Sequence, residues 1–393
     1  MKKRQRPTVP GQLAGKPEAH GAGAASLGRI DWQLVGFVLA VKVVVVWVGV
    51  QAFLIGMDQP LPSPNGWLAV WNQWDAPHYL DIARDGYVLG GEQERWIVFY
   101  PLYPWLIRAA AFVLRDELVA AFLVSAIASV AAALLLKRLG ELDEPERVAR
   151  LSVFFLFAFP TAYFLHIGYT ESLFLALALG SFLAARRRRW PWAGALGALA
   201  AMTRINGLLL IPALAVEAFL QYREGERRPR AEWLWIALVG AGFGVYLLVN
   251  WQVFGDPWKF LWMQERYWDK ELTWPWVGIR KQFTDLPRRP PSDAQMVAWQ
   301  EMFFVALGLA CTVWSWLRLR TSYAVWMTCN WLLWTSTKFI LSAPRYTLVL
   351  FPMYFLLARV ADRRPAWGAV IALWSLLLMG LFITRFVQGY WAF

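Results

Sequence analysis

The sequence has few charged residues for its length. They make up 17% of its 393 residues, whereas soluble domains average about 25%. Hydrophobic residues make up 58%, and they occur in long blocks. This composition excludes a cytosolic enzyme, a disordered protein and a disulfide-stapled scaffold. It predicts an all-α polytopic membrane protein.

Cysteine and histidine are also scarce. Cys311 and Cys329 both lie inside apolar blocks, so they indicate neither a disulfide nor a zinc site. The three histidines, His20, His78 and His166, are too few to indicate a metal cluster. The sequence therefore predicts no metal site and no other cofactor, and it leaves metal dependence open.

The apolar blocks predict about eleven transmembrane helices, because a span needs about 20 apolar residues. Their approximate ranges are 34–53, 118–136, 152–168, 172–185, 193–202, 205–220, 233–254, 303–316, 323–341, 348–358 and 368–386. Residues 1–28 are polar and predict a disordered cytoplasmic tail. Residues 29–393 are expected to form a single multispanning domain.

Basic residues orient these spans. With the N-terminus in the cytoplasm, 23 of the 39 lysines and arginines fall on the cytoplasmic side, as the positive-inside rule requires. Long extracytoplasmic loops then lie near 51–117 and 255–299. The run Arg186–Arg189 is interpreted as a topology anchor, not as a nucleic-acid site. The short apolar segment 100–114 contains Arg108 and predicts an amphipathic or partly re-entrant helix on the outer side.

Four ionisable residues from distant parts of the sequence reach this outer side. They are Asp75, Glu171, Arg204 and Arg345. Ionisable residues at span ends that face a shared cavity are functional candidates. Three of the four also have a structural explanation. Asp75 would cap the helix that follows it, and the arginines would extend to lipid headgroups.

The spacing Asp75, His78, Asp81 places three polar side chains along one predicted helix. It fits a metal site or, more commonly, a solvated amphipathic helix. Pro77 at an early helical position supports a helix that begins at Asp75.

Short motifs follow one another between Trp71 and Pro352. They are Trp74-Asp75 with Tyr79-Leu80, the stretch Phe99-Tyr100-Pro101-Leu102-Tyr103-Pro104, Phe159-Pro160-Thr161-Ala162, Tyr169-Thr170-Glu171-Ser172, Thr203-Arg204-Ile205-Asn206-Gly207, and Pro344-Arg345-Tyr346 before Phe351-Pro352. In order and spacing they resemble the GPI mannosyltransferase 2 (PIG-V-like) family, over most of the chain.

The resemblance implies a glycosyltransferase of the GT-C class, and more specifically a mannosyltransferase. Such an enzyme moves a hexose from a polyprenyl-phosphate donor to a lipid-linked or surface glycan acceptor, on the extracytoplasmic face of the plasma (inner) membrane. The basic tail, the arginine and alanine content and the short loops are typical of a bacterial protein. Bacteria make no GPI anchors, so the eukaryotic acceptor is not carried over.

For this chemistry we predict that Asp75 is the catalytic base that takes the proton of the acceptor hydroxyl. The predicted substrate-binding residues have three roles. They are Arg204, Arg345 and more weakly Lys338 for the donor phosphate, Glu171 and His78 for orienting the sugar or the base, and Tyr79 and Asn206 for further contacts.

Two other functions compete with this hypothesis. A transporter or flippase of a lipid-linked glycan would place ionisable residues at the membrane midplane and often has internal repeats. The sequence shows no repeat between its halves, and its acidic candidates lie at one face. A non-catalytic scaffold in a membrane complex would tolerate substitution of Asp75 and Glu171.

Overall fold

The computed structural model describes residues 30–225 and 228–393, so the predicted tail at 1–28 lies outside the described residues. The described residues fold into helices joined by turns and loops. No strand occurs in these described ranges, and the extended pairing found there is an isolated bridge between Leu272 and Thr337. The predicted all-α class is therefore confirmed.

Six of the described helical segments are long and apolar enough to cross a membrane. They are α1 (Trp32–Met57), α5 (Glu117–Gly140), η3 with α9 (Ile205–Leu209, Leu210–Glu224), η4 with α10 (Ala231–Ile236, Ala237–Phe254), α13 with η6 and α14 (Pro291–Ala294, Gln295–Trp299, Gln300–Arg318), and α18 (Pro365–Val387). The predicted number of eleven spans is not confirmed.

The other predicted spans contain shorter helices. They are α6 (Glu146–Phe157), α7 (Glu171–Arg186), α8 (Trp190–Ala201), α15 (Thr321–Thr335) and α17 (Pro352–Arg363). Even the 16 residues of α7 extend only about 24 Å, against about 30 Å for the hydrocarbon core. Thirteen of those residues are buried. A helix enclosed by protein can be interrupted within the membrane, because neighbouring helices satisfy its free backbone groups.

Short helices occupy the connection between α1 and α5. They are α2 (Gly66–Ala69), α3 (Ala76–Asp85), η1 (Glu92–Val98) and α4 (Leu102–Leu114), and η1 and α4 meet at a bend of 113°. Arg108 of α4 donates hydrogen bonds to the carbonyls of Ala83 and Arg84, the latter at 3.0 Å. It thus satisfies the C-terminal end of α3, which explains a charge in an apolar helix.

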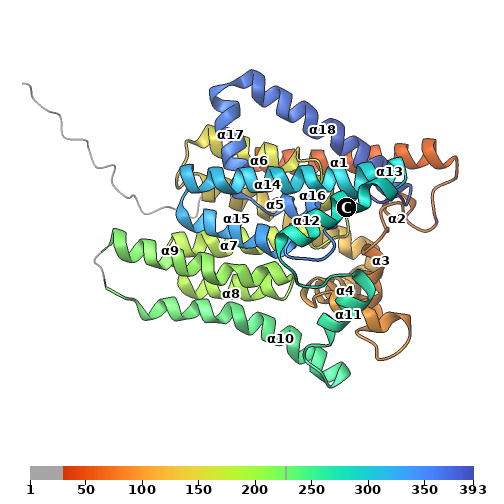
Figure 1. The fold of residues 1–393 in the computed structure, drawn as a ribbon, viewed down its shortest axis with the longest axis horizontal. Helices are drawn as coiled ribbons and strands as arrows, with labels where there is room; N and C mark the ends of the chain where they lie inside the picture. Colours follow the sequence, from red (N-terminus) through yellow and green to blue (C-terminus); the bar gives the residue numbers. More distant parts are fainter. Residues whose placement is uncertain (1–29, 226–227) are drawn as a thin grey trace, which may run out of the picture. The chain divides into compact units, whose positions relative to one another are not determined.

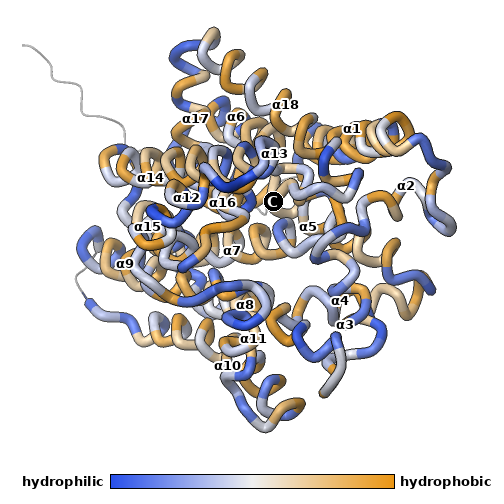
Figure 2. Tube along the Cα trace, turned by 45° about the vertical axis from the view of Figure 1, so that its right-hand side comes forward, coloured by the Kyte–Doolittle hydropathy of each residue, from blue (hydrophilic) through white to orange (hydrophobic). Residues whose placement is uncertain are grey.

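The second long connection and a late turn supply the remaining elements. They are α11 (Lys259–Trp268), α12 (Pro275–Asp285), η5 (Leu286–Arg288) and α16 (Ala343–Leu348), while η2 (Ala162–Leu165) lies between α6 and α7. Figure 1 shows α2, α3, α4 and α11 gathered at one end of the long helices. In Figure 2 the long helices are mostly hydrophobic, whereas the connections at this end carry hydrophilic stretches.

Ion pairs join the helix ends at the other end of α7. Arg186 pairs with Asp143, and Arg320 pairs with Glu217, which also accepts a hydrogen bond from Ser322. We call these five residues the basic-end network. It ties the α5–α6 turn to α7, α9 and α15, whose arginine-bearing ends therefore lie together.

Candidate functional site

The loop that carries Asp75 is held in a strained conformation. Trp74 has φ of 58°, which costs a residue with a bulky side chain about 1–3 kcal/mol. Tyr169 holds the loop through two hydrogen bonds. Its hydroxyl donates to the carbonyl of Gln73 at 2.8 Å and accepts from the N–H of Asp75 at 3.2 Å. Trp391 packs edge-on against Trp74, with ring centroids 5.1 Å apart.

Asp75 occupies the N-cap position of α3, but its side chain makes no capping hydrogen bond. Its Oδ2 instead accepts a hydrogen bond from Nη1 of Arg345 at 2.6 Å. The side chain of Asp75 is 28% exposed, whereas that of Arg345 is 8% exposed. The carboxylate is therefore the part of this pair that solvent or a ligand can reach.

Glu171 connects this pair to a second arginine. Its Oε1 accepts hydrogen bonds from Nε of Arg345 and from Nη1 of Arg204, and Arg204 also donates to the Thr170 hydroxyl at 2.9 Å. We call Asp75, Glu171, Arg204 and Arg345 the acid–base network. It brings together side chains that are up to 270 positions apart, and its two carboxylates balance its two guanidinium groups.

A buried carboxylate fixes the short helix α16, which presents Arg345. Glu301 of α14 accepts hydrogen bonds from the N–H groups of Ser342 and Ala343, at 2.7 and 2.6 Å. The guanidinium of Arg345 then lies 4.6 Å from the ring centre of Tyr169. Glu301 stands at the start of an apolar helix, and nothing in its local sequence marks this capping role.

Close packing positions the turn that carries Arg204. A Cβ atom on Gly207 would lie 2.3 Å from the backbone nitrogen of Ala201, so only glycine lets η3 cross the end of α8 this closely. Asn206 is buried, and its side-chain amide donates to Asn330 of α15 at 2.8 Å. This hydrogen bond anchors the turn, while the predicted substrate contact of Asn206 stays a prediction.

Tyr79 and His78 lie on α3 beside the network. Burial raises the pKa of Tyr79 well above its usual value, and the nearby charge of Asp75 raises it further. The phenol therefore stays protonated and can donate a hydrogen bond toward these carboxylates. His78 stacks on Trp96 with ring centroids 4.9 Å apart, and burial lowers its pKa, so the imidazole is neutral at pH 7. The substrate contacts of both residues stay predictions.

The acid–base network is not saturated by its own hydrogen bonds. Oε2 of Glu171 is buried and has no hydrogen-bond partner among the described residues. Asp75 receives one side-chain hydrogen bond within the same ranges, on Oδ2 alone. Buried polar atoms are almost always paired in folded proteins, so Oε2 of Glu171 is suited to accept a hydrogen bond from a bound polar molecule, and the partly exposed Oδ1 of Asp75 is free to accept another.

Lys270, in the second long connection, was not singled out by the sequence. Its ammonium donates to the carbonyls of Phe339 and Leu341, at 3.3 and 3.4 Å, and lies 6.0 Å from the ring of Tyr346. Arg204 lies 5.7 Å from the same ring. Within the described ranges Lys270 forms no ion pair. Only the folded chain reveals this placement, because the connection has no motif at Lys270.

Lys338, the lysine that the sequence suggested, is differently placed. It is half-exposed, and its ammonium lies 3.2 Å from the carboxylate of Glu271. This ion pair neutralises its charge at the surface. The predicted role of Lys338 toward the donor phosphate stays a prediction.

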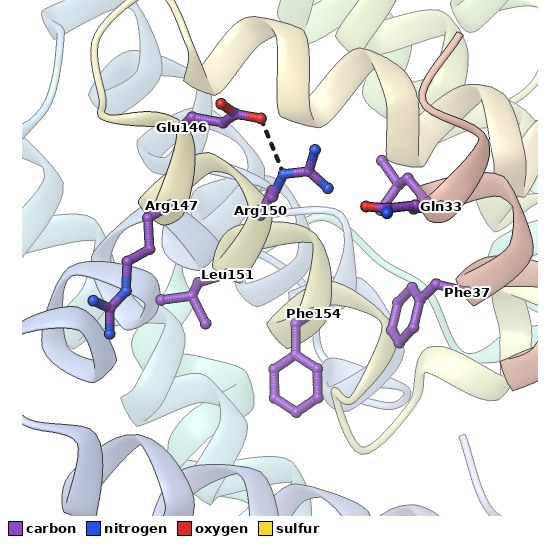
Figure 3. A pocket seen from close by; sticks show the side chains of 8 residues that line it. Gln33, Phe37, Glu146, Arg147, Arg150, Leu151 and Phe154 are labelled. Atoms are coloured by element: carbon purple, nitrogen blue, oxygen red, sulfur yellow. Dashed lines mark hydrogen bonds and ion pairs between the residues drawn. The ribbon is translucent and has the colours of Figure 1, made fainter.

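Two cavities lie apart from these residues. One, of about 640 Å³, opens between α1 and α6 and is lined by Phe37, Phe154 and the hydrogen-bonded pair Glu146 and Arg150 (Figure 3). The other is an apolar groove along α5 and α7. In the described part of the chain, no three His, Cys, Asp or Glu side chains are grouped closely enough to hold a metal ion.

Comparisons with known proteins agree with the resemblance seen in the motifs. A family model described as "Dolichyl-phosphate-mannose-protein mannosyltransferase" matches residues 100–263. GPI mannosyltransferase 2 of Schizosaccharomyces pombe is 34% identical, over 35% of this chain and 30% of its own. The protein of that name from Yarrowia lipolytica is 26% identical, over 60% of this chain and 71% of its own. GPI alpha-1,6-mannosyltransferase 2 of Mus musculus is 33% identical, over 37% of this chain and 31% of its own.

The resemblance to GPI mannosyltransferase 2 proteins is therefore confirmed, although the chain matches only about a third of the fission-yeast and mouse proteins. Among solved structures, ArnT from Cupriavidus metallidurans bound to undecaprenyl phosphate superposes with a TM-score of 0.51. The match covers 92% of this chain and 69% of ArnT, at 17% identity. At this identity the likeness establishes a shared fold.

Proposed function

We propose that this protein is a membrane glycosyltransferase that moves a hexose, in the first instance mannose, from a polyprenyl-phosphate donor to a glycan or glycolipid acceptor. The observation that carries the proposal is the partly exposed carboxylate of Asp75, held by Arg345 in an otherwise largely buried acid–base network. The relatives and their names support the choice of sugar and of lipid-linked donor.

The reaction exchanges one bond at the anomeric carbon of the sugar. The acceptor oxygen forms a bond to that carbon while the bond to the phosphate oxygen breaks, and polyprenyl phosphate leaves with the bonding electrons. The acceptor hydroxyl loses its proton to Asp75. A positioned carboxylate commonly contributes about 10²–10⁴-fold through such proton transfer.

Arg345 is better suited to orient Asp75 than to bind the phosphate. Its Nε and Nη1 are occupied by Glu171 and Asp75, and its guanidinium packs against aromatic rings. A guanidinium with two fixed carboxylates has little freedom to follow a leaving group. We therefore assign Arg345 as a positioning residue for the base.

We assign the phosphate to the cations beside Tyr346. Arg204 and Lys270 both lie within about 6 Å of that ring, and Lys270 has no carboxylate partner in the described ranges. A phosphate anion that leaves from the sugar would meet one guanidinium and one ammonium there. Hydrogen bonds between two charged groups are about twice as strong as neutral ones, so these contacts would favour departure of the phosphate.

The sugar would lie between the base and these cations. Oε2 of Glu171 has no partner within the described ranges, and the protonated hydroxyl of Tyr79 lies beside the same charges. One can accept a hydrogen bond from a sugar hydroxyl, and the other can donate one. We also propose that this face is extracytoplasmic, because lipid-phosphate sugars are presented there and the basic helix ends lie at the opposite end of α7.

Product analysis tests the reaction. Membranes with and without the protein are supplied with radiolabelled polyprenyl-phosphate mannose or with its glucose analogue, and lipid-linked and glycan products are separated. We expect protein-dependent label on an acceptor from the mannose donor. Label that crosses sealed vesicles without joining an acceptor would instead establish the transporter hypothesis.

Accessibility labelling tests the sidedness. Single cysteines at Glu271 and at Arg363, in a variant whose Cys311 and Cys329 are replaced, are exposed to an impermeant maleimide in intact cells. We expect labelling at position 271 alone. Labelling at position 363 alone would place the acid–base network on the cytoplasmic face and contradict the proposal.

A further inference from the structure

An apolar groove of about 590 Å³ lies between α4, α5, α7 and α8, and the proposed reaction assigns it no role. It is lined along its length by Leu106, Ile127, Ala131, Leu177 and Trp192. From Leu173 to Arg187 along α7 it extends about 21 Å at 1.5 Å per residue, or about two-thirds of a hydrocarbon core. Its length and lining suit one lipid hydrocarbon chain.

One end of this groove is strongly positive. Arg138, Arg187 and Arg189 line it there, and the charges of Arg138 and Arg189 act repulsively on Arg187. The adjacent Arg186 pairs with Asp143, yet Arg187 and Arg189 form no ion pair with any described residue. The helix α8 begins at Trp190, so the positive end of its dipole lies beside Arg189.

We propose that this groove binds one anionic phospholipid, with an acyl chain between α5 and α7 and its phosphate on Arg187 and Arg189. Charge complementarity selects the headgroup, since Arg187 and Arg189 form no ion pair with a described residue and an anion would give them one. The site lies at the opposite end of α7 from Glu171. The proposed phosphate position on Arg187 and Arg189 shares no residue with the acid–base network, so the proposal does not depend on the proposed transferase activity.

Lipid retention tests the proposal directly. The purified full chain is equilibrated in detergent with equal amounts of phosphatidylglycerol and phosphatidylcholine, and native mass spectrometry measures which lipid stays bound. We expect one retained phosphatidylglycerol. The variant R187Q/R189Q should bind it at least tenfold more weakly, and A131F, which fills the groove and keeps the arginines, should also lose it.

The double variant R363Q/R364Q is the matched control. It removes two exposed arginines outside the groove and should retain phosphatidylglycerol as the unmodified protein does. Equal retention of phosphatidylcholine would overturn the proposal, as would wild-type binding in R187Q/R189Q or an equal loss in the control. Thermal unfolding of each variant separates loss of the lipid from loss of the fold.

Discussion

Two ion networks lie at opposite ends of α7, and they differ in how completely their carboxylates are satisfied. In the basic-end network both oxygens of Glu217 are used, by Arg320 at 2.7 and 3.0 Å, by Ser322 at 2.8 Å and by Gln221 at 2.9 Å. In the acid–base network both arginines share one oxygen of Glu171, and its other oxygen has no described partner.

This difference separates a structural role from a chemical one. A saturated buried network fixes the positions of its helices and has nothing left to offer a ligand. An unsaturated network retains hydrogen-bonding capacity at a cost in stability, which is typical of sites that bind substrate. Substitutions at the two ends should therefore have different effects. Those at Glu217 should lower the stability of the fold, and those at Asp75 should lower the turnover.

The largest expected effect is on turnover, in Asp75→Asn. The amide keeps the size of the side chain but cannot take the acceptor proton, so the rate of transfer should fall by about 10²–10⁴-fold. Labelled product from the donor assay measures it. Asp81→Asn is the matched control, because Asp81 lies on the same helix and pairs with Arg84 at the surface. Full activity in Asp75→Asn would remove Asp75 from the mechanism.

The next effect is on stability, in Glu217→Leu. Removing one partner of a buried ion pair costs about 3–5 kcal/mol, because it leaves a poorly compensated charge. Thermal unfolding of the purified protein should show this loss, with an unchanged donor KM in the folded fraction. Glu224→Gln removes the exposed partner of Arg320 and should cost less than about 1 kcal/mol.

If Glu217→Leu unfolds at the temperature of the unmodified protein but binds the donor more weakly, the basic-end network has a role in substrate binding, and its assignment as purely structural is wrong.

The sequence predicted one part of this comparison well. The helical class and the four residues of the acid–base network could be named in advance, because apolar blocks mark helices and isolated charges at their ends are conspicuous. The basic-end ion pairs could not be predicted. Several arginines and glutamates compete there, and only the folded chain selects Arg186 with Asp143.

Other features depend on tertiary contacts that no local pattern encodes. The strained Trp74, the Glu301 cap on α16 and the placement of Lys270 all involve residues distant in sequence. The predicted number of eleven spans exceeds the six long apolar helical segments of the described residues for a related reason. Apolar segments such as α7 are enclosed by protein, so they need not be long enough to cross the membrane alone.

The third prediction compares two lysines near the same end. Lys270→Gln removes a cation that, like Arg204, lies near the ring of Tyr346 and forms no ion pair with a described residue. The donor KM should therefore rise about 10–100-fold, the value of one charge-assisted hydrogen bond. Lys338→Gln removes a lysine already paired with Glu271 and should change the donor KM less than about threefold. Donor titrations at saturating acceptor measure both. If the donor KM is unchanged in Lys270→Gln and rises more in Lys338→Gln, the donor phosphate is bound by Lys338, the lysine that the sequence suggested.

The smallest expected effect concerns His78 and pH. Burial lowers the pKa of His78 in the folded protein, so the unfolded chain binds a proton more readily than the folded chain as the pH falls through the usual histidine range. Stability should therefore rise with pH up to about 6.5 and gain nothing from His78 above it. In His78→Phe, which keeps the stacking on Trp96, the change in unfolding temperature between pH 5.5 and 7.5 should be smaller than in the unmodified protein. If both proteins show the same change, the imidazole titrates alike in both states, and its stacked position has no electrostatic consequence.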